Sequence, residues 1–561
     1  MNFSLLKVLH RMSESTSKFP HQLFSFFRRY TDQNLDDESL SVLQKLYTQL
    51  QAGHASIQIE PSWIETIKSL EEQKIVGRTN ENYPIVRTDE GNLYFQRYYK
   101  YEANLAKRLI HWSIQKNHSE SQINPKIIDC LKNSPDQLQA AKLAVQNSFA
   151  VITGGPGTGK TYLLVAILAN LLKQNPDLKI SLVAPTGKAA QRMTESIQAN
   201  IHLFPLTEEE KINFPQYAST IHRLLRSLPP SIHFRKNKDS QLNADFVIVD
   251  EASMVDLPLM SKLVDSIKPN SRLLLIGDID QLSPVEAGAP LASVVSYFLL
   301  PEKTQLVAKL TTNRRFGRDS TINKLCHAIS EGKTKEVLNV IDEGNKEDFE
   351  FLKNGFFDKS DEIIKNGYFE LAQAKTPAEA HDAFLKFQIL CPTHEGENGV
   401  NALNQKTQAL LGIKEDKNNN HRYSGMPIII EQNDYGVDLF NGDIGIFLPD
   451  EKQNNQLVAW FMRSDGTYRA VSAPRLPPYK LAYAMTVHRS QGSEYNQVMI
   501  MLPNHHTEIL SRHLLYVACS RARQKVTLIG SPKIIESCIN HYTPNSNGLQ
   551  NRLLDASNQT N

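Results

Sequence analysis

The chain has 561 residues, of which 40% are hydrophobic and 22% are charged, and its net charge is +2 at pH 7. These values are ordinary for a globular protein of several domains, and they neither require nor exclude a nucleic-acid partner, because such binding needs only a local basic groove. The five cysteines are scattered and form no CxxC pair, which excludes a zinc-finger spacing and a disulfide framework. No apolar run is long enough to span a bilayer. We therefore expect a cytoplasmic protein without a membrane partner.

The first 130 residues carry mixed helical patterns and one predicted hairpin. Residues 83–86 and 93–95 are apolar and flank a turn-like Asp-Glu-Gly-Asn at 89–92. Proline-containing breaks at 124–125 and 133–135 separate this part from the next. We predict a mainly helical N-terminal domain over residues 1–130.

Residues 154–161 read GGPGTGKT and lie between an apolar run at 149–152 and a helical pattern at 160–173. Strand, glycine loop and helix in this order form a phosphate-binding loop, in which glycines let backbone N–H groups surround phosphate oxygens and the helix N-terminus adds positive dipole character. A chance glycine turn is disfavoured because every required residue lies in order between the required elements. We predict that Lys160 contacts the β- and γ-phosphates of ATP and that Thr161 ligates Mg²⁺. The predicted nucleotide-binding set is Gly154, Gly155, Pro156, Gly157, Thr158, Gly159, Lys160, Thr161 and Tyr162.

The region from about 131 to 355 alternates apolar strands with amphipathic helices. The strands that we expect lie at residues 150–153, 180–184, 246–249 and 273–276. Alternation of this kind is typical of a parallel sheet covered by helices on both faces.

Two of these strands end in polar residues suited to nucleotide chemistry. The strand at 246–249 is followed by Asp250, a predicted Mg²⁺ ligand, and Glu251, which is placed to polarise the attacking water. Two solvated acids at a strand end are the alternative, which the phosphate loop upstream disfavours. The strand at 273–276 is followed by Gln281, which we expect to sense the γ-phosphate or the attacking water, although a polar loop would look the same.

Weaker signals come from three further segments. Gln137 lies 17 residues before Gly154 and could pair with an adenine edge, although an isolated glutamine is more often a surface residue. The helix starts in APTGKAA at 184–190 and STIHR at 219–223 suit the phosphates of a nucleic-acid strand, and ordinary capped helices are the alternative.

A second α/β unit begins near residue 387 and resumes at 483–530. Between its two parts, short strands at 428–430, 442–447 and 457–461 predict a small β-barrel insertion at about 415–478. Residues 343–376 are largely polar and predict no clear element. Residues after 542 are rich in Asn, Gln and Ser, and we expect them to fray.

The second unit also carries phosphate-binding and ribose-binding chemistry, in AMTVHRSQGSE at 484–494, and arginines at the edge of each unit. Arg521 lies at a predicted helix end, and Arg314 and Arg315 lie in the segment NRRF at 313–316. Arginines from a facing domain can stabilise the charge on a transferred phosphoryl group. Surface arginines without such a role are commoner, so each is weak alone.

Taken together, the segments GGPGTGKT, APTGKAAQRM, STIHRLL, VDEASMVDLPLM, GDIDQLSPVEAG, NRRF, AMTVHRSQGSEY and YVACSRA resemble the ordered motif set of a superfamily 1 helicase. Their details most closely resemble the RecD family, the alpha subunits of RecBCD enzymes. LYFQRYYKYE and SNGLQNRLL also resemble that family, so the resemblance covers nearly the whole chain.

The resemblance implies an α/β fold with two RecA-like parallel-sheet domains at 131–355 and 356–545, an SH3-like barrel inserted in the second, an N-terminal domain that docks on RecC, and a polar tail at 546–561. It implies an ATP-dependent 5′-to-3′ DNA helicase that acts with RecB and RecC in double-strand-break repair and homologous recombination.

The resemblance also implies roles for individual residues. The implied catalytic residues are Lys160, Asp250, Glu251, Gln281, Arg315 and Arg521. Outside the phosphate loop, the implied nucleotide contacts are Gln137, Gly492 and Glu494, and the implied metal ligands are Thr161 and Asp250. The implied DNA contacts are Thr186, Lys188, Thr220, His222, Thr486, His488 and Gln491.

Two positions depart from the family pattern. Arg314 stands where an aromatic residue is usual, so the arginine finger is assigned to Arg315 by its match to Arg-Phe-Gly. Ser520 stands where threonine is common and keeps the hydroxyl. Two alternatives stay open: a stand-alone RecD-like helicase, which would carry a larger N-terminal region, and a regulatory subunit whose ATPase is dispensable.

Overall fold

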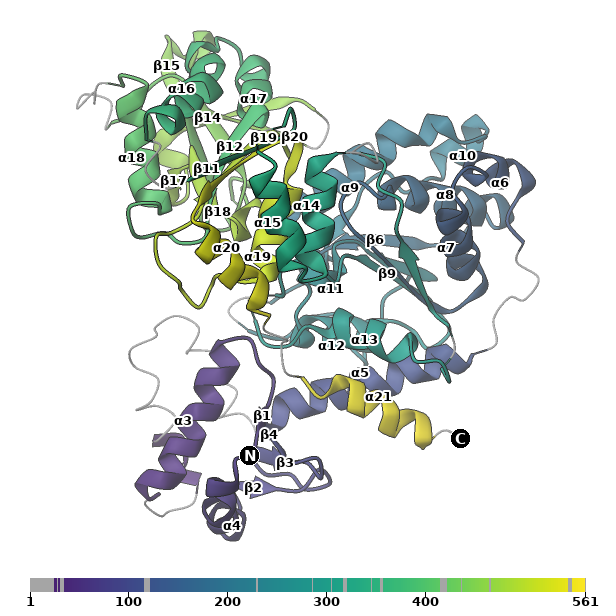
Figure 1. The fold of residues 1–561 in the computed structure, drawn as a ribbon. Coiled ribbons are helices and arrows are strands. Elements are labelled where there is room, and N and C mark those ends of the chain that lie inside the picture. The colour runs from purple at the N-terminus through teal and green to yellow at the C-terminus, as the bar shows by residue number, and fades with distance from the viewer. Residues whose placement is uncertain are drawn as a thin grey trace.

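The computed structural model describes residues 25–27, 29–30, 35–115, 122–228, 231–284, 286–303, 305–315, 320–344, 346–353, 357–413, 421–434, 436–463, 466–542 and 547–559. Figure 1 shows a small N-terminal unit beneath two larger α/β units that lie side by side. Among the described residues, no helix is long and apolar enough to cross a membrane.

The N-terminal unit combines helices with a small sheet. Its helices are α3 (Asp37–Gln51), η1 (Pro61–Trp63), α4 (Ile64–Glu72) and α5 (Gln96–Ile114). Its four-stranded sheet has the order β1-β4-β3-β2, from strands β1 (Ile57–Gln58), β2 (Val76–Gly77), β3 (Ile85–Arg87) and β4 (Asn92–Phe95). The antiparallel pairing of β3 with β4 confirms the predicted hairpin. The sequence analysis predicted a mainly helical domain and did not indicate strands β1 and β2 of this sheet.

The first α/β domain is built on a parallel sheet of order β10-β5-β9-β8-β6-β7. Its strands are β5 (Phe149–Gly154), β6 (Ile180–Ala184), β7 (Ser219–Thr220), β8 (Phe246–Val249), β9 (Arg272–Gly277) and β10 (Val307–Leu310). The four strands expected from the sequence are therefore confirmed to within a residue at each end. Its helical elements are α6 (Pro125–Leu131), α7 (Pro135–Gln146), α8 (Lys160–Gln174), α9 (Gly187–Asn200), η2 (Ile201–Leu203), α10 (Glu208–Ile212), α11 (Ile221–Leu225), η3 (Ala252–Met254), α12 (Leu257–Ser266) and α13 (Pro290–Phe298).

Alternate residues of these strands enter two separate cores, because successive side chains of a strand point to opposite faces. Ile152 and Ile248 pack with α8 in one core, whereas Val151 and Val249 pack with α12 and α13 in the other. The second core also contains Trp112 of α5, whose indole N–H donates to the Pro269 carbonyl at 2.9 Å. Helix α5 thus anchors the N-terminal unit to the first α/β domain.

The second α/β domain has a parallel sheet of order β11-β20-β19-β12-β18. Its strands are β11 (Phe349–Lys353), β12 (Phe387–Cys391), β18 (Ala484–Thr486), β19 (Tyr495–Met501) and β20 (Ala522–Gly530). Its helical elements are α14 (Thr321–Ser330), α15 (Thr334–Asp342), α16 (Phe357–Gln373), α17 (Pro377–Lys386), α18 (Val400–Leu410), η7 (His488–Ser490), α19 (Arg512–Ser520) and α20 (Pro532–Asn540). The polar stretch without a predicted element therefore contains both β11 and α16.

An antiparallel sheet of order β16-β15-β14-β13-β17 is inserted between β12 and β18, and we call it the inserted β domain. Its strands are β13 (Met426–Ile430), β14 (Ile444–Asp450), β15 (Gln456–Met462), β16 (Tyr468–Ser472) and β17 (Tyr479–Leu481), with short helices η5 (Glu451–Gln453) and η6 (Ala473–Arg475). These strands confirm the short strands that the sequence predicts in this region. Closure of the sheet into an SH3-like barrel stays a prediction.

The chain ends in a helix, α21 (Leu549–Asn558), so the expectation that residues after 542 fray is wrong for this segment. Leu549 and Leu553 are fully buried in the same core as Trp112. Figure 1 shows α21, in yellow, lying along α5 beneath the first α/β domain. Ala556 and Arg552 of the same helix are also buried, and the Arg552 guanidinium pairs with Glu90 of the N-terminal unit at 2.6 Å, so one face of this polar helix packs against its neighbours.

Candidate nucleotide and nucleic-acid site

The glycine-rich loop connects β5 directly to α8, as predicted. Gly157 and Gly159 have φ angles of 77° and 79°, which non-glycine residues rarely adopt. A side chain at either position would also collide, since an added Cβ would lie 2.6 Å from the Cβ of Arg315 at Gly157 and 2.5 Å from the Nε2 of Gln137 at Gly159. The loop needs glycine for its backbone and for the close approach of these two residues.

The side chains of the loop are held by its own backbone. The Lys160 ammonium donates to the carbonyls of Gly154 and Gly155 at 2.7 and 3.0 Å, and the Thr158 hydroxyl donates to the Gly155 carbonyl at 2.8 Å. Gln137 is fully buried, and its amide donates to the carbonyls of Thr158 and Gly159, whereas its Oε1 has no hydrogen-bond partner. Gln137 therefore braces the loop and keeps one unused acceptor.

The predicted acid pair follows β8 at the same edge of the sheet. Glu251 has a φ of 50°, a left-handed conformation uncommon outside glycine, and its Oε2 is buried without a hydrogen-bond partner. Burial and the neighbouring Glu251 charge raise the pKa of Asp250 to about 6, against the opposing charge of Lys160. A strained backbone and unpaired carboxylate oxygens are features of sites built for a cationic or proton-donating ligand.

The end of β9 contributes two more buried polar side chains. Asp278 and Gln281 are 1% and 4% exposed, and the Oε1 of Gln281 has no partner. Gln281 lines the same cleft as Lys160, Asp250 and Glu251. The predicted first-domain residues are thus brought together.

The facing wall comes from the second domain and from the segment after β10. Arg315 Nη2 lies 2.5 Å from Glu494 Oε1, Arg523 Nε lies 3.1 Å from Glu494 Oε2, and Arg192 of α9 lies 3.9 Å from Glu494. Burial opposes ionisation of Glu494, yet the arginine charges, led by Arg315 and Arg192, lower its pKa to about 2. The residues 316–317 used to assign Arg315 lie outside the described residues.

Arg521 is 3% exposed and is fixed by its own domain. Its guanidinium donates to the backbone carbonyls of Val517 and Ser493 at 3.3 and 3.2 Å, and it approaches the Ser520 hydroxyl at 3.5 Å. Ser520 therefore contacts Arg521 through its hydroxyl, a group that a threonine at this position would also supply.

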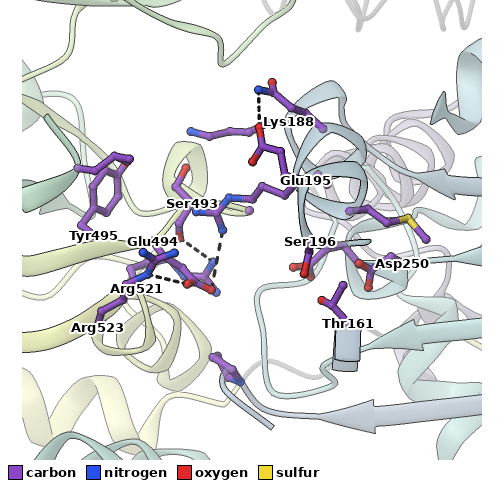
Figure 2. A pocket seen from close by; sticks show the side chains of 18 of the residues that line it. Thr161, Lys188, Glu195, Ser196, Asp250, Ser493, Glu494, Tyr495, Arg521 and Arg523 are labelled. Atoms are coloured by element: carbon purple, nitrogen blue, oxygen red, sulfur yellow. Dashed lines mark hydrogen bonds and ion pairs between the residues drawn. The ribbon is translucent and has the colours of Figure 1, made fainter. Parts of the chain in front are cut away.

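A cleft of 710 Å³ lies between the two walls. Figure 2 shows Thr161 and Asp250 on one side and Ser493, Glu494, Arg521 and Arg523 on the other. Pro156, Tyr162, Arg315 and Gly492, which has a φ of 69°, also line it. The Tyr162 hydroxyl donates to the Cys130 carbonyl at 3.3 Å. Most of the predicted nucleotide residues thus line one cavity, whereas Gly154, Gly155, Thr158 and Gln137 are not among its lining residues.

The predicted DNA contacts follow the carboxyl ends of strands in both sheets. Thr186 and Thr220 cap α9 and α11 by accepting the N–H groups of Ala189 and Arg223, and Thr486 accepts the N–H of Arg489. His488 begins η7, and burial lowers its pKa. Gln491 has a buried Nε2 without a partner, and His222 lies next to Phe234, with ring centroids 5.7 Å apart. All six residues lie at or just after the ends of strands, and none of them lines the interdomain cleft.

Lys188 lies elsewhere than we expected, in the wall of the interdomain cleft. Burial is the main reason that its pKa falls to about 7, and Asp443 of the inserted β domain opposes this shift. Its contact with DNA stays a prediction.

Several cleft residues were missed by the sequence reasoning. Arg192 and Arg523 line the cleft and belong to segments that were singled out, and Arg192 stands within APTGKAAQRM. A basic side chain one turn after a predicted phosphate-binding helix start is the signal that could have indicated Arg192. The Tyr516 hydroxyl and Asp278 meet only because two domains come together, so no local pattern indicates that pair.

Family models match parts of both α/β domains. Residues 137–287 match the AAA domain family, and residues 481–529 match the UvrD-like helicase C-terminal domain. The RecBCD enzyme subunit RecD of Mycolicibacterium smegmatis is 34% identical over 431 residues, covering 75% of each chain. The RecBCD enzyme subunit RecD of Buchnera aphidicola from Acyrthosiphon pisum is 31% identical over 507 residues, covering 83% of each.

Two further similarities are more partial. The ATP-dependent RecD2 DNA helicase of Deinococcus radiodurans is 31% identical over 401 residues, which cover 71% of this chain and 49% of that protein. A solved structure of Bacteroides Pif1 bound to single-stranded DNA aligns with 72% of this chain and 93% of its own, at 18% identity and a TM-score of 0.42.

Proposed function

This chain belongs to the RecD family of superfamily 1 helicases and is an ATP-dependent DNA helicase, and we propose that it is the 5′-to-3′ motor subunit of a RecBCD-type enzyme. The observation that supports this most is the cleft, whose two walls carry complementary halves of a nucleotide site. Lys160, Asp250, Glu251 and Gln281 line one wall, and Glu494 and Arg521 line the other. We propose RecB and RecC as partners, and double-strand-break repair and recombination as the setting.

We propose that ATP binds with its phosphates on the loop at 154–161. Lys160 would leave the carbonyls of Gly154 and Gly155 for the β- and γ-phosphates, because a phosphate is a stronger acceptor than a neutral carbonyl. Gln137 and Tyr162 would contact the base, and Gly492 and Glu494 the ribose.

The proposed chemistry is water attack on the γ-phosphate. Glu251 accepts the proton of the water, and Gln281 orients that water with its unpaired Oε1. Arg315 and Arg521 stabilise the charge that develops on the phosphoryl oxygens. Closure of the cleft would bring these two arginines to the phosphate, and release of the products would let it open.

The residues present fit a magnesium ion. Thr161 offers a hydroxyl and Asp250 a carboxylate, both lining the cleft, and oxygen donors of this kind suit Mg²⁺ when substrate phosphates complete its coordination. The Glu251 Oε2 is buried without a hydrogen-bond partner, and burial and the Glu251 charge raise the pKa of Asp250 in spite of Lys160, so a further cation would stabilise this acidic pair. When bound, the ion would neutralise phosphate charge, and Thr161 and Asp250 would hold it.

DNA would lie across the strand ends that carry Thr186, Lys188, Thr220, His222, Thr486, His488 and Gln491. Hydroxyl and amide groups there suit the sugar–phosphate backbone, so sequence should matter little. Steps along the strand would follow from opening and closing of the cleft, because both α/β domains contribute to this surface.

The proposal is tested by purifying the full-length chain from its host with whatever co-purifies, and assaying unwinding of duplexes with a 5′ or a 3′ tail. We expect two large partners to co-purify with the chain. We also expect the chain to unwind duplexes with a 5′ tail preferentially, and Lys160→Gln to abolish this unwinding. An active monomer without partners would support the stand-alone alternative, although the chain spans only 49% of the Deinococcus RecD2 helicase. Unchanged 5′-tail unwinding by complexes with Lys160→Gln would support the regulatory-subunit alternative.

A further inference from the structure

The hydroxyl of Tyr516 joins the two α/β domains through a buried hydrogen bond. Tyr516 lies on α19 of the second domain and is 5% exposed. Its hydroxyl donates to the Oδ2 of Asp278, in the first domain, at 3.0 Å. A Cβ added to Gly155 would lie 2.9 Å from the same hydroxyl oxygen. One group of the second domain thus contacts both the start of the phosphate loop and the acid that follows β9.

Asp278 connects this hydroxyl to the nucleotide residues. Its Oδ1 accepts the N–H of Asp280 at 3.1 Å, and its backbone carbonyl accepts the N–H of Gln281 at 3.2 Å. Burial raises the pKa of Asp278, while the charge of Lys160 and the hydrogen bonds to the carboxyl group act in the opposite direction. The position of Asp278 therefore sets the turn that presents Gln281 to the cleft.

A phenylalanine would fill the same space as Tyr516, but it would leave a buried carboxylate without one of its donors. Losing a donor to a buried charged group is costly, so the carboxylate would move toward another partner. Lys160 is the nearby cation whose charge acts on Asp278. Such a shift would draw the Gln281 turn and the Lys160 ammonium away from the places that phosphate chemistry requires.

We propose that Tyr516 is a positioning residue for ATP hydrolysis, which acts through Asp278 to align Gln281 and Lys160 when the domains close. Because the hydroxyl belongs to the second domain, alignment depends on how the two domains sit, and hydrolysis is tied to closure of the cleft. This inference rests on the proposed function and adds to it a residue that touches neither the phosphates nor the attacking water.

The test measures ATP turnover by the full-length chain against ATP concentration, at saturating single-stranded DNA, for wild type, Tyr516→Phe, Asp278→Asn and the double variant. We expect Tyr516→Phe to lower kcat about tenfold and to raise KM for ATP by a smaller factor, because Gln281 acts only in hydrolysis whereas Lys160 also contacts the bound phosphates. The double variant should be no slower than Asp278→Asn, because the hydroxyl acts through that carboxylate.

Tyr368→Phe is the matched control. It also removes a buried hydroxyl, one that donates to the Tyr483 carbonyl in the core of the second domain, away from the cleft. We expect it to lower the melting temperature without lowering kcat. A purely structural role of Tyr516 would give the same pattern.

A kcat of Tyr516→Phe within twofold of wild type, or independent losses that multiply in the double variant, would overturn the inference alone. A wild-type chain without ATP turnover would contradict the proposed function, and the inference with it. If Tyr516→Phe does not fold, Asp278→Asn provides the same kcat-against-KM comparison, and an unchanged kcat there would equally overturn the inference.

Discussion

The guanidinium of Arg315 and the carboxylate of Glu494 are paired across the cleft at 2.5 Å, with both side chains about one-fifth exposed. Arg315 follows the last strand of the first sheet, whereas Glu494 belongs to the second domain. The proposed phosphate-contacting arginine and the proposed ribose-contacting acid therefore form an ion pair with each other. ATP would have to separate the two side chains, so we expect this ion pair to couple nucleotide binding to movement of the domains.

Replacing Arg315 with alanine should lower kcat for ATP by on the order of a thousandfold, because arginine fingers contribute mainly to the transition state. Affinity for ATP should change little. The measurement is steady-state turnover together with equilibrium nucleotide binding. Arg87→Ala removes a similar arginine–glutamate pair, with Glu71, in the N-terminal unit and should leave turnover unchanged. Full turnover in Arg315→Ala would exclude this residue from the chemistry.

Glu251→Gln should stop hydrolysis while preserving ATP binding, since the amide keeps the size of the side chain but cannot accept the proton. A loss of about a hundredfold or more is expected for removal of a general base. Single-turnover assays with bound ATP measure this step directly. Hydrolysis at the wild-type rate would assign the base elsewhere.

Glu102 of α5 predicts a pH dependence of stability. It is fully buried, its Oε1 accepts the N–H of Gly548 at 3.0 Å, and burial raises its pKa to about 8. A carboxyl group whose pKa is raised on folding stabilises the fold below its unfolded pKa, and that contribution is lost as pH rises toward 8. At pH 8, Glu102→Gln should therefore have a higher melting temperature than wild type and a free energy of unfolding larger by on the order of 2 kcal/mol, and at pH 5 the two proteins should be close in stability. An equal difference at both pH values would contradict this account.

Leu553→Ala should loosen the C-terminal helix. Leu553 is fully buried among residues of α5 and the first domain, and loss of a buried leucine costs about 2–5 kcal/mol. Thermal unfolding should show a lower first transition, with faster hydrogen exchange in both α21 and α5. Asn558→Ala, at an exposed position of the same helix, is the control. Exchange in α5 that is unchanged by Leu553→Ala would mean that the two helices are held independently.

The parts predicted well from the sequence are those whose chemistry is contiguous. Residues 154–161 contain the whole loop and its flanking elements, and the strand expected at 246–249 is β8, followed at once by Asp250 and Glu251. Strands of this kind are apolar on both faces, so their length and position are evident without knowledge of the fold.

The parts predicted poorly depend on distant contacts. Helix α21 is a polar sequence with few apolar residues, and Leu553 is buried only because α5 lies more than 400 residues earlier in the chain and beside it in space. The Tyr516–Asp278 bond joins residues 238 positions apart, and Lys188 lines the cleft together with Asp443 of the inserted β domain. Such relationships arise from domain packing, which local periodicity does not encode.

The most direct test of the central claim, that this cleft hydrolyses ATP to move the chain along DNA, is ATP turnover of the full-length protein with and without single-stranded DNA, compared between wild type and Lys160→Gln. Lys142→Gln, on the exposed side of α7, is the matched control. We predict turnover that rises with DNA in wild type and Lys142→Gln, and falls to background in Lys160→Gln under both conditions. The account would be contradicted if Lys160→Gln turned over ATP at the wild-type rate, or if the turnover of wild type were the same with and without DNA.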